Sequence, residues 1–103
     1  MTLQVVFEAD AEAELNDAIN WYDSQTEGVG QVFSREARAT LAEAAKNPHR
    51  FPFAGPTTQK VKIINWPYSI YFTLVENPAQ LVVVSVFHGA RDPAELRRRL
   101  KRH

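Results

Sequence analysis

The sequence of 103 residues contains no cysteine. Disulfides and thiolate metal sites are therefore excluded, and a reducing cytoplasm suits such a chain. Long apolar runs are also missing, because the longest lies within residues 81–87 and a membrane helix needs about 20 residues. The N-terminal residues lack the basic stretch and the apolar core of a signal peptide. We therefore expect a soluble, cytoplasmic protein without a membrane partner.

Motifs for small ligands are scarce as well. The three histidines form no HxxxH pair, and no glycine-rich loop is present to hold nucleotide phosphates. We therefore expect no metal and no cofactor. With 45% hydrophobic and 23% charged residues, the composition is that of a globular domain. The length suits one domain, residues 1–103, with a single modest core.

Basic residues are rare in the N-terminal half of the chain and acidic residues are rare in the C-terminal half, although the net charge is zero. Residues 1–45 contain nine acidic and two basic residues, whereas residues 46–103 contain ten basic and three acidic ones. This asymmetry favours an anionic partner for the C-terminal half. The alternative is that the charges only keep helical surfaces in water.

Hydrophobic periodicity predicts the secondary structure. Residues 3–7 alternate as in a strand, and residues 11, 15, 18, 19 and 22 form an apolar stripe at helical spacing behind a cap at Asp10. In residues 59–64, Lys60 and Lys62 share one strand face, and Val61 and Ile63 share the other. The predicted order is a strand, a helix to about residue 25, a second helix to residues 47–48, strands over 59–64, 68–75 and 80–87, and a short helix.

The connections complete an α+β prediction. Phe51 and Phe53 should pin the proline-rich segment 48–56 onto the core, and residues 76–79 should form a hairpin turn. Strand 80–87 is apolar on both faces and belongs in the centre of the sheet. Asp92 and Glu95 have the spacing of a capping box. We predict a helical hairpin on one face of a small, mostly antiparallel sheet with a three-strand meander.

Four segments carry a resemblance to a known family. They are AEAEL with WY (residues 11–15 and 21–22), NP with FP (47–48 and 51–52), PYSIY (67–71) and VFHGARDP (86–93). In this order and spacing they are similar to the ParE branch of the RelE/ParE toxin superfamily, which includes plasmid stabilisation proteins. The resemblance covers nearly the whole chain.

The resemblance implies a fold of the kind predicted above and a cognate antitoxin that neutralises the chain. It also implies one of two targets. ParE-like members inhibit DNA gyrase, whereas RelE-like members are nucleases that cleave mRNA on the ribosome. A third possibility is a non-toxic module that only binds the antitoxin.

The residues favour the ParE-like alternative. RelE-like nucleases typically carry an arginine at the position of Ser69 and a tyrosine near the C-terminus, whereas Tyr71 is the last tyrosine here. No catalytic residue is therefore assigned. A nuclease would rely on the basic and titratable residues that remain, which are Arg91, Lys60, Lys62 and His88.

Candidate target-binding residues lie in the basic half of the chain. They are Lys60, Lys62, Tyr68, His88, Arg91, Arg97, Arg98 and Arg99. Leu96 and Leu100 are one helical turn apart and are candidates for antitoxin binding. Each residue also has a structural alternative: Arg91 can pair with a helix carboxylate, and the two leucines can anchor the last helix to the core.

Overall fold

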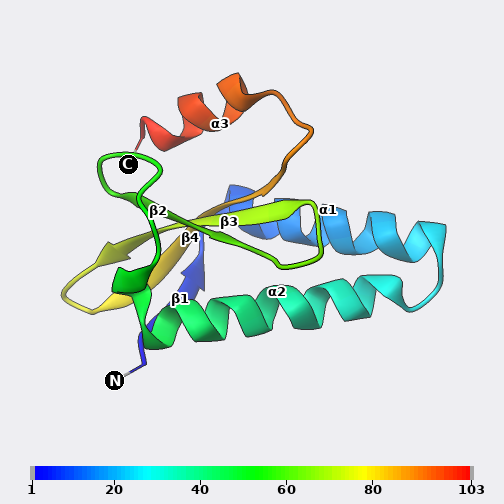
Figure 1. Cartoon of the computed structure of the whole chain (residues 1–103), viewed down its shortest axis with the longest axis horizontal. Coiled ribbons are helices and arrows are strands. Elements are labelled where there is room, and N and C mark those ends of the chain that lie inside the picture. The colour runs from blue at the N-terminus through cyan, green and yellow to red at the C-terminus, as the bar shows by residue number, and fades with distance from the viewer. Residues whose placement is uncertain (1, 103) are drawn as a thin grey trace.

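The computed structural model describes residues 2–102 and has the predicted α+β architecture (Figure 1). A four-stranded sheet lies between a pair of long helices and one short helix. In chain order the elements are β1 (Gln4–Phe7), α1 (Ala9–Gln25), α2 (Val29–Lys46), a 3-10 turn (Pro48–Arg50), β2 (Thr58–Lys62), β3 (Tyr68–Val75), β4 (Gln80–His88) and α3 (Pro93–Leu100). Within this part of the chain no helix combines the length and apolarity of a membrane span.

The sheet has the strand order β1-β4-β3-β2, so β4 lies in its interior as predicted. The meander β2-β3-β4 is antiparallel, whereas β1 pairs in parallel with β4, with Val5 opposite Leu81. Because β1 ends opposite Val83, the remaining residues of β4 have no strand on that side. This open stretch of β4 forms part of the candidate site.

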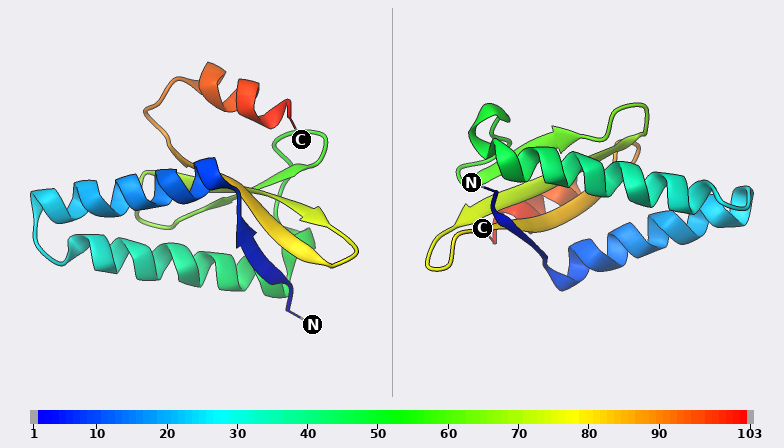
Figure 2. Two further views of the ribbon diagram at one scale, coloured as in Figure 1. Left: turned by 180° about the vertical axis from the view of Figure 1, so that it is seen from behind. Right: turned by 90° about the horizontal axis from the view of Figure 1, so that it is seen from below.

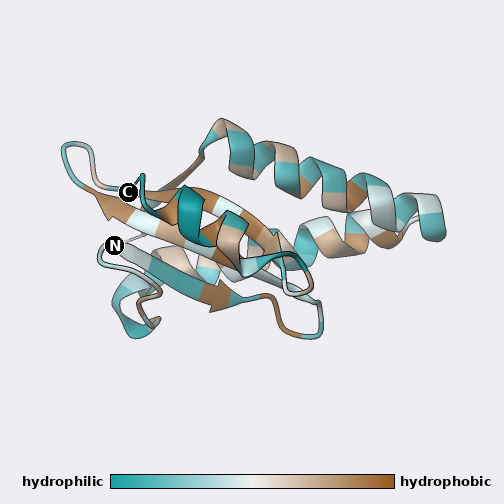
Figure 3. Ribbon diagram, turned by 90° about the horizontal axis from the view of Figure 1, so that it is seen from above, coloured by the Kyte–Doolittle hydropathy of each residue, from teal (hydrophilic) through white to brown (hydrophobic). Residues whose placement is uncertain are grey.

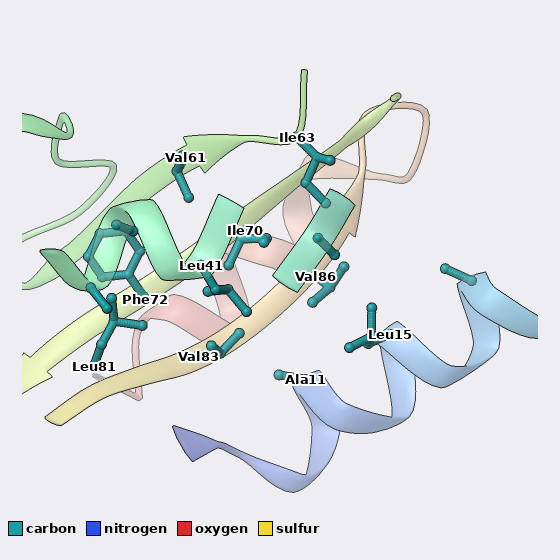
Figure 4. Close-up of a cluster of buried hydrophobic side chains, with 14 of the residues drawn as sticks. Ala11, Leu15, Leu41, Val61, Ile63, Ile70, Phe72, Leu81, Val83 and Val86 are labelled. Carbon is teal, nitrogen blue, oxygen red and sulfur yellow. The ribbon is translucent and has the colours of Figure 1, made fainter. Parts of the chain in front are cut away.

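The helices α1 and α2 cover one face of the sheet, which we call the hairpin face. The predicted stripe of α1 is buried through Ala11, Leu15 and Ala18. These side chains meet the apolar residues of β3 and β4, among them Ile70 and Val83 (Figure 4). Full burial of a side chain such as Leu15, Ile70 or Val83 contributes about 1.5–3 kcal/mol. This cluster is larger than the one on the opposite face and is the main core.

The short helix α3 covers part of the opposite face, which we call the α3 face (Figure 2). A smaller cluster forms there from Tyr71, Val84 and Phe87, against which Leu96 and Leu100 pack. In Figure 3, which looks down on α3, much of the helix is hydrophilic while apolar residues colour the strands behind it. The last helix is therefore held by one narrow apolar side.

A close approach of the two long helices fixes their turn. The Asp23 carboxylate accepts a hydrogen bond of 2.7 Å from the Gly30 backbone N–H. A Cβ on residue 30 would overlap the Ile19 carbonyl oxygen and the Asp23 side chain. Glycine is required there because the backbones nearly touch, although its helical conformation is open to any residue.

Two capping predictions are wrong or incomplete. Helix α1 begins at Ala9 with Glu8 as its N-cap residue, so Asp10 already lies in the first turn. At α3, Asp92 caps as predicted, since its Oδ1 accepts from the Ala94 N–H at 2.9 Å. The capping box is not completed, because the Glu95 carboxylate binds Arg91.

The segment before β2 is held by a buried amide. Phe51 packs against the core as predicted, but Phe53 is 65% exposed, so its predicted anchoring role is wrong. The buried Gln59 amide donates instead to the carbonyl oxygens of Pro48 and Phe51, at 2.6 and 3.0 Å. The Pro48 carbonyl oxygen also accepts from the Phe51 N–H at 3.4 Å, so the Gln59 amide ties both ends of this turn to β2.

Candidate functional site

The predicted target-binding residues lie on both faces of the sheet. Lys60 pairs with Tyr71 in the register of β2 and β3, and Tyr71 belongs to the cluster on the α3 face. Tyr68 pairs with His88, and Tyr68 packs against the core on the hairpin face. Side chains of directly paired residues point to the same face. The lysines and the tyrosine–histidine pair are therefore separated by the sheet.

The α3 face carries a group of exposed bases. Lys60 is exposed, with its Nζ 5.9 Å from the centre of the Tyr71 ring. Lys62 is exposed as well, and its Nζ donates to the Trp66 carbonyl oxygen at 2.8 Å. On α3 the exposed bases are Arg97 and Arg98. We call these four side chains, Lys60, Lys62, Arg97 and Arg98, the basic surface.

His88 and Tyr68 form a ring pair on the hairpin face. Their ring centres are 4.9 Å apart at an interplanar angle of 82°. The Ala90 N–H donates to His88 Nδ1 at 2.9 Å. Burial raises the pKa of the Tyr68 hydroxyl, and the nearby Tyr22 adds to the increase.

Arg91 is held between two carboxylates. Its two terminal nitrogens lie 2.7 Å from oxygens of Glu14 and of Glu95. The guanidinium carbon lies 4.5 Å from the centre of the Phe87 ring. The hydrogen bond to Glu95 raises the pKa of Arg91 most, and Glu14 acts in the same direction against desolvation. Pairing with a helix carboxylate is the structural alternative that was predicted for Arg91 from the sequence.

Glu14 of α1 is the central residue of this network, and the sequence analysis did not single it out. Its Oε1 accepts from the Ser85 hydroxyl at 3.0 Å and from the Val86 backbone N–H at 3.1 Å. The carboxylate thus satisfies a β4 amide that lies beyond the end of β1. Residues 11 and 18 of the buried stripe flank Glu14 at helical spacing, a signal that would have found it.

Arg99 also points into the protein. It lies 2.5 Å from Glu14 Oε1 and 3.5 Å from Asp10, and it donates to Ser85 at 3.0 Å. Its side chain is only 16% exposed, and its Nε is buried without a hydrogen-bond partner among the described residues. Contact of Arg99 or Arg91 with a target would require these ion pairs to break.

Leu96 and Leu100 pack against Tyr71, Val84 and Phe87 and are partly buried. The two leucines therefore anchor the last helix to the core, which is the structural alternative predicted for them from the sequence. Contact of the two leucines with an antitoxin would have to use their exposed edges or displace α3.

The set proposed for a nuclease is not assembled at one place. Lys60 and Lys62 lie on the α3 face, His88 lies on the hairpin face, and both ends of Arg91 are bound by carboxylates. General acid–base catalysis requires its groups within about 3 Å of one reacting centre. Among residues 2–102 no group of three histidine, aspartate or glutamate side chains could hold a metal ion.

Comparison with known proteins gives matches only at the level of structure. A scan of family models gives no match, and a search of curated protein sequences gives no relative. A chain of the chromosomal ParDE TA system from P. aeruginosa superposes with a TM-score of 0.72 at 11% identity, covering 84% of this chain and 96% of that one. A mutant of the E. coli toxin RelE in the free state superposes with a TM-score of 0.60 at 17% identity, covering 99% and 98%.

Both structures align over most of their length, and the sequence motifs pointed to the same superfamily. The chain therefore has the RelE/ParE fold.

Proposed function

We propose that the chain is the toxin of a type II toxin–antitoxin pair and that, like ParE, it inhibits DNA gyrase. The engagement of Arg91 by Glu14 and Glu95 favours this choice over a nuclease, because Arg91 is then not free to bind the scissile phosphate. Ser69, which stands where RelE-like nucleases carry an arginine, removes a second cation.

The basic surface is the proposed contact for the target and for an acidic antitoxin segment. Lys60, Lys62, Arg97 and Arg98 are exposed and lie on the α3 face. An acidic segment would complement them and would mask the surface from the target. Antitoxin contact at Leu96 and Leu100 stays a prediction. Since gyrase and the ribosome are cytoplasmic, we propose the cytoplasm as the place of action.

The test is controlled expression of the full chain without its antitoxin, in cells followed for growth, DNA-damage induction and transcript integrity. The proposal expects growth arrest with DNA damage and intact transcripts, together with loss of supercoiling by purified gyrase when the chain is added. Normal supercoiling in the presence of folded chain would contradict gyrase inhibition.

A RelE-like ribosome-dependent nuclease is the second candidate, because Lys60 and Lys62 lie side by side on an open sheet face. It expects cut transcripts and loss of cleavage in Arg91→Ala. Soluble protein without growth arrest would leave the third alternative, a non-toxic antitoxin-binding module. Co-expression with the product of the neighbouring reading frame then tests the antitoxin partnership on its own.

A further inference from the structure

A small cleft opens beside α1 on the hairpin face, away from the basic surface. Its volume is about 260 Å³, and its walls come from α1, β3, β4 and the turn after β4. The cleft is below the roughly 300–1,000 Å³ of sites for free small molecules, so its size suits one side chain of a partner. The lining includes Asp17, Trp21, Tyr68, His88 and Arg91.

Trp21 is the unusual residue of this cleft. It is 57% exposed, whereas the other large apolar side chains of α1, Leu15, Ile19 and Tyr22, pack against the core. Among residues 2–102 the one aromatic ring paired with it is that of Tyr22, at a centre distance of 5.1 Å and an angle of 80°. The indole therefore keeps much of its surface in water. An exposed tryptophan is a common anchor in protein interfaces because one side chain buries a large area.

The Asp17 carboxylate gives the cleft a negative charge. Glu14 is neutralised by Arg91 and Arg99, and Arg91 is also neutralised by Glu95. Asp17 is exposed and takes part in no ion pair among residues 2–102. It precedes Trp21 by one helical turn, so its carboxylate and the indole lie on the same side of α1.

We propose that this cleft binds an arginine side chain of a protein partner, with the guanidinium against the Trp21 indole and paired with the Asp17 carboxylate. A planar guanidinium stacks on an aromatic face and binds a carboxylate through parallel N–H groups. An anion is disfavoured because it would meet Asp17, while Arg91, the arginine of the lining, is already paired with Glu14 and Glu95. The cleft and the basic surface are separated by the sheet, so the chain has two contact surfaces of different charge.

The test is an NMR titration of the full chain with N-acetylarginine amide at constant ionic strength. N-acetylcitrulline amide has nearly the same shape without the charge and serves as the matched probe. The expected shifts are confined to the Trp21 indole N–H and the amides around Ala18, Val86 and His88, with a Kd on the order of millimolar. Equal shifts with both probes, or no shifts at the cleft, would overturn the proposal.

Two variants complete the test. Asp17→Asn should weaken binding of the arginine probe about five-fold, which is the loss expected for one exposed ion pair. Glu12→Gln removes an equally exposed acid from the same helix outside the cleft and should leave the Kd unchanged. If both variants weaken binding equally, the probe binds only through the general negative charge of α1, and the proposal is wrong.

Discussion

The Glu14 carboxylate of α1 lies 2.7 Å from the Arg91 guanidinium, which follows β4. The same carboxylate binds Arg99 of α3 and the backbone of Val86. One side chain therefore joins the hairpin, the open edge of β4 and the last helix. The position of α3 depends on this residue as well as on its two leucines.

Replacement of Glu14 by glutamine should destabilise the protein. Glu14→Gln keeps the shape of the side chain but removes the negative charge that pairs with Arg91 and Arg99. Because the Glu14 side chain is only 13% exposed, water replaces little of that lost interaction. We expect a loss of about 2 kcal/mol, below the roughly 3–5 kcal/mol of a fully buried pair. Urea unfolding measures the loss, with the exposed Glu12→Gln as control. Equal stability of the two variants would contradict the central role of Glu14.

Gln59→Glu should release the segment before β2. A carboxylate cannot donate the two hydrogen bonds to Pro48 and Phe51, and it would be buried next to carbonyl oxygens. The expected cost is about 2–3 kcal/mol, with faster hydrogen exchange of the Lys60 amide, which bonds to Pro52. Gln31→Glu makes the same change at an exposed position of α2 and should be nearly neutral. Unchanged exchange at Lys60 would count against the prediction.

Gly30→Ala should loosen the α1–α2 turn. The added methyl group would overlap the Ile19 carbonyl oxygen, and backbone cannot move aside as a flexible side chain can. We expect a loss of about 1–3 kcal/mol in thermal or urea unfolding. Gly55→Ala is the matched control, since its Cβ would lie 3.9 Å from its nearest neighbour, Thr58. A stable Gly30→Ala variant would mean that the helices separate at little cost.

Stability should fall at alkaline pH through Tyr68. Burial raises the pKa of its hydroxyl in the folded state, so the folded protein holds the proton more tightly than the unfolded chain. The contribution is complete below the unfolded pKa of about 10 and is lost as pH rises toward the folded value. Tyr68→Phe should flatten the decrease between roughly pH 9 and 11, measured by urea unfolding. An unchanged slope would assign the decrease to other groups.

Lys60→Glu should reduce growth arrest without unfolding the protein. Lys60 is exposed on the basic surface, so its reversal should change stability by about 0.5 kcal/mol or less. Repulsion of an acidic or nucleic-acid partner should weaken binding at least tenfold. Lys46→Glu reverses an exposed charge at the end of α2 and serves as the control. Full toxicity of Lys60→Glu would exclude this surface from target contact.

The order and type of the elements followed from local patterns in the sequence. The stripe of α1 and the two-sided apolar pattern of β4 each report burial within a few residues. The parallel pairing of β1 with β4 is not local, since it joins residues about 76 positions apart. No pattern within either strand specifies that partner.

The candidate site was only partly predictable for the same reason. The sequence identified Arg91, yet its partners Glu14 and Glu95 became clear only when α1, β4 and α3 were placed together. Arg97, Arg98 and Arg99 were all predicted to bind a target, but helical geometry turns Arg99 inward while Arg97 and Arg98 face solvent. Trp21 follows the buried Ala18 of α1 by three residues, yet it is 57% exposed.

The parallel pairing of β1 also affects how the chain folds during translation. The strand Gln4–Phe7 leaves the ribosome early, but its partner residues 80–83 are added only much later. At synthesis rates of about 5–20 residues per second, β1 stays unpaired for several seconds at least. The hairpin of α1 and α2 can form in that interval, whereas the sheet cannot be completed. A nascent chain of this fold therefore lacks its complete sheet, and the surfaces built on it, until residues 80–83 have been added.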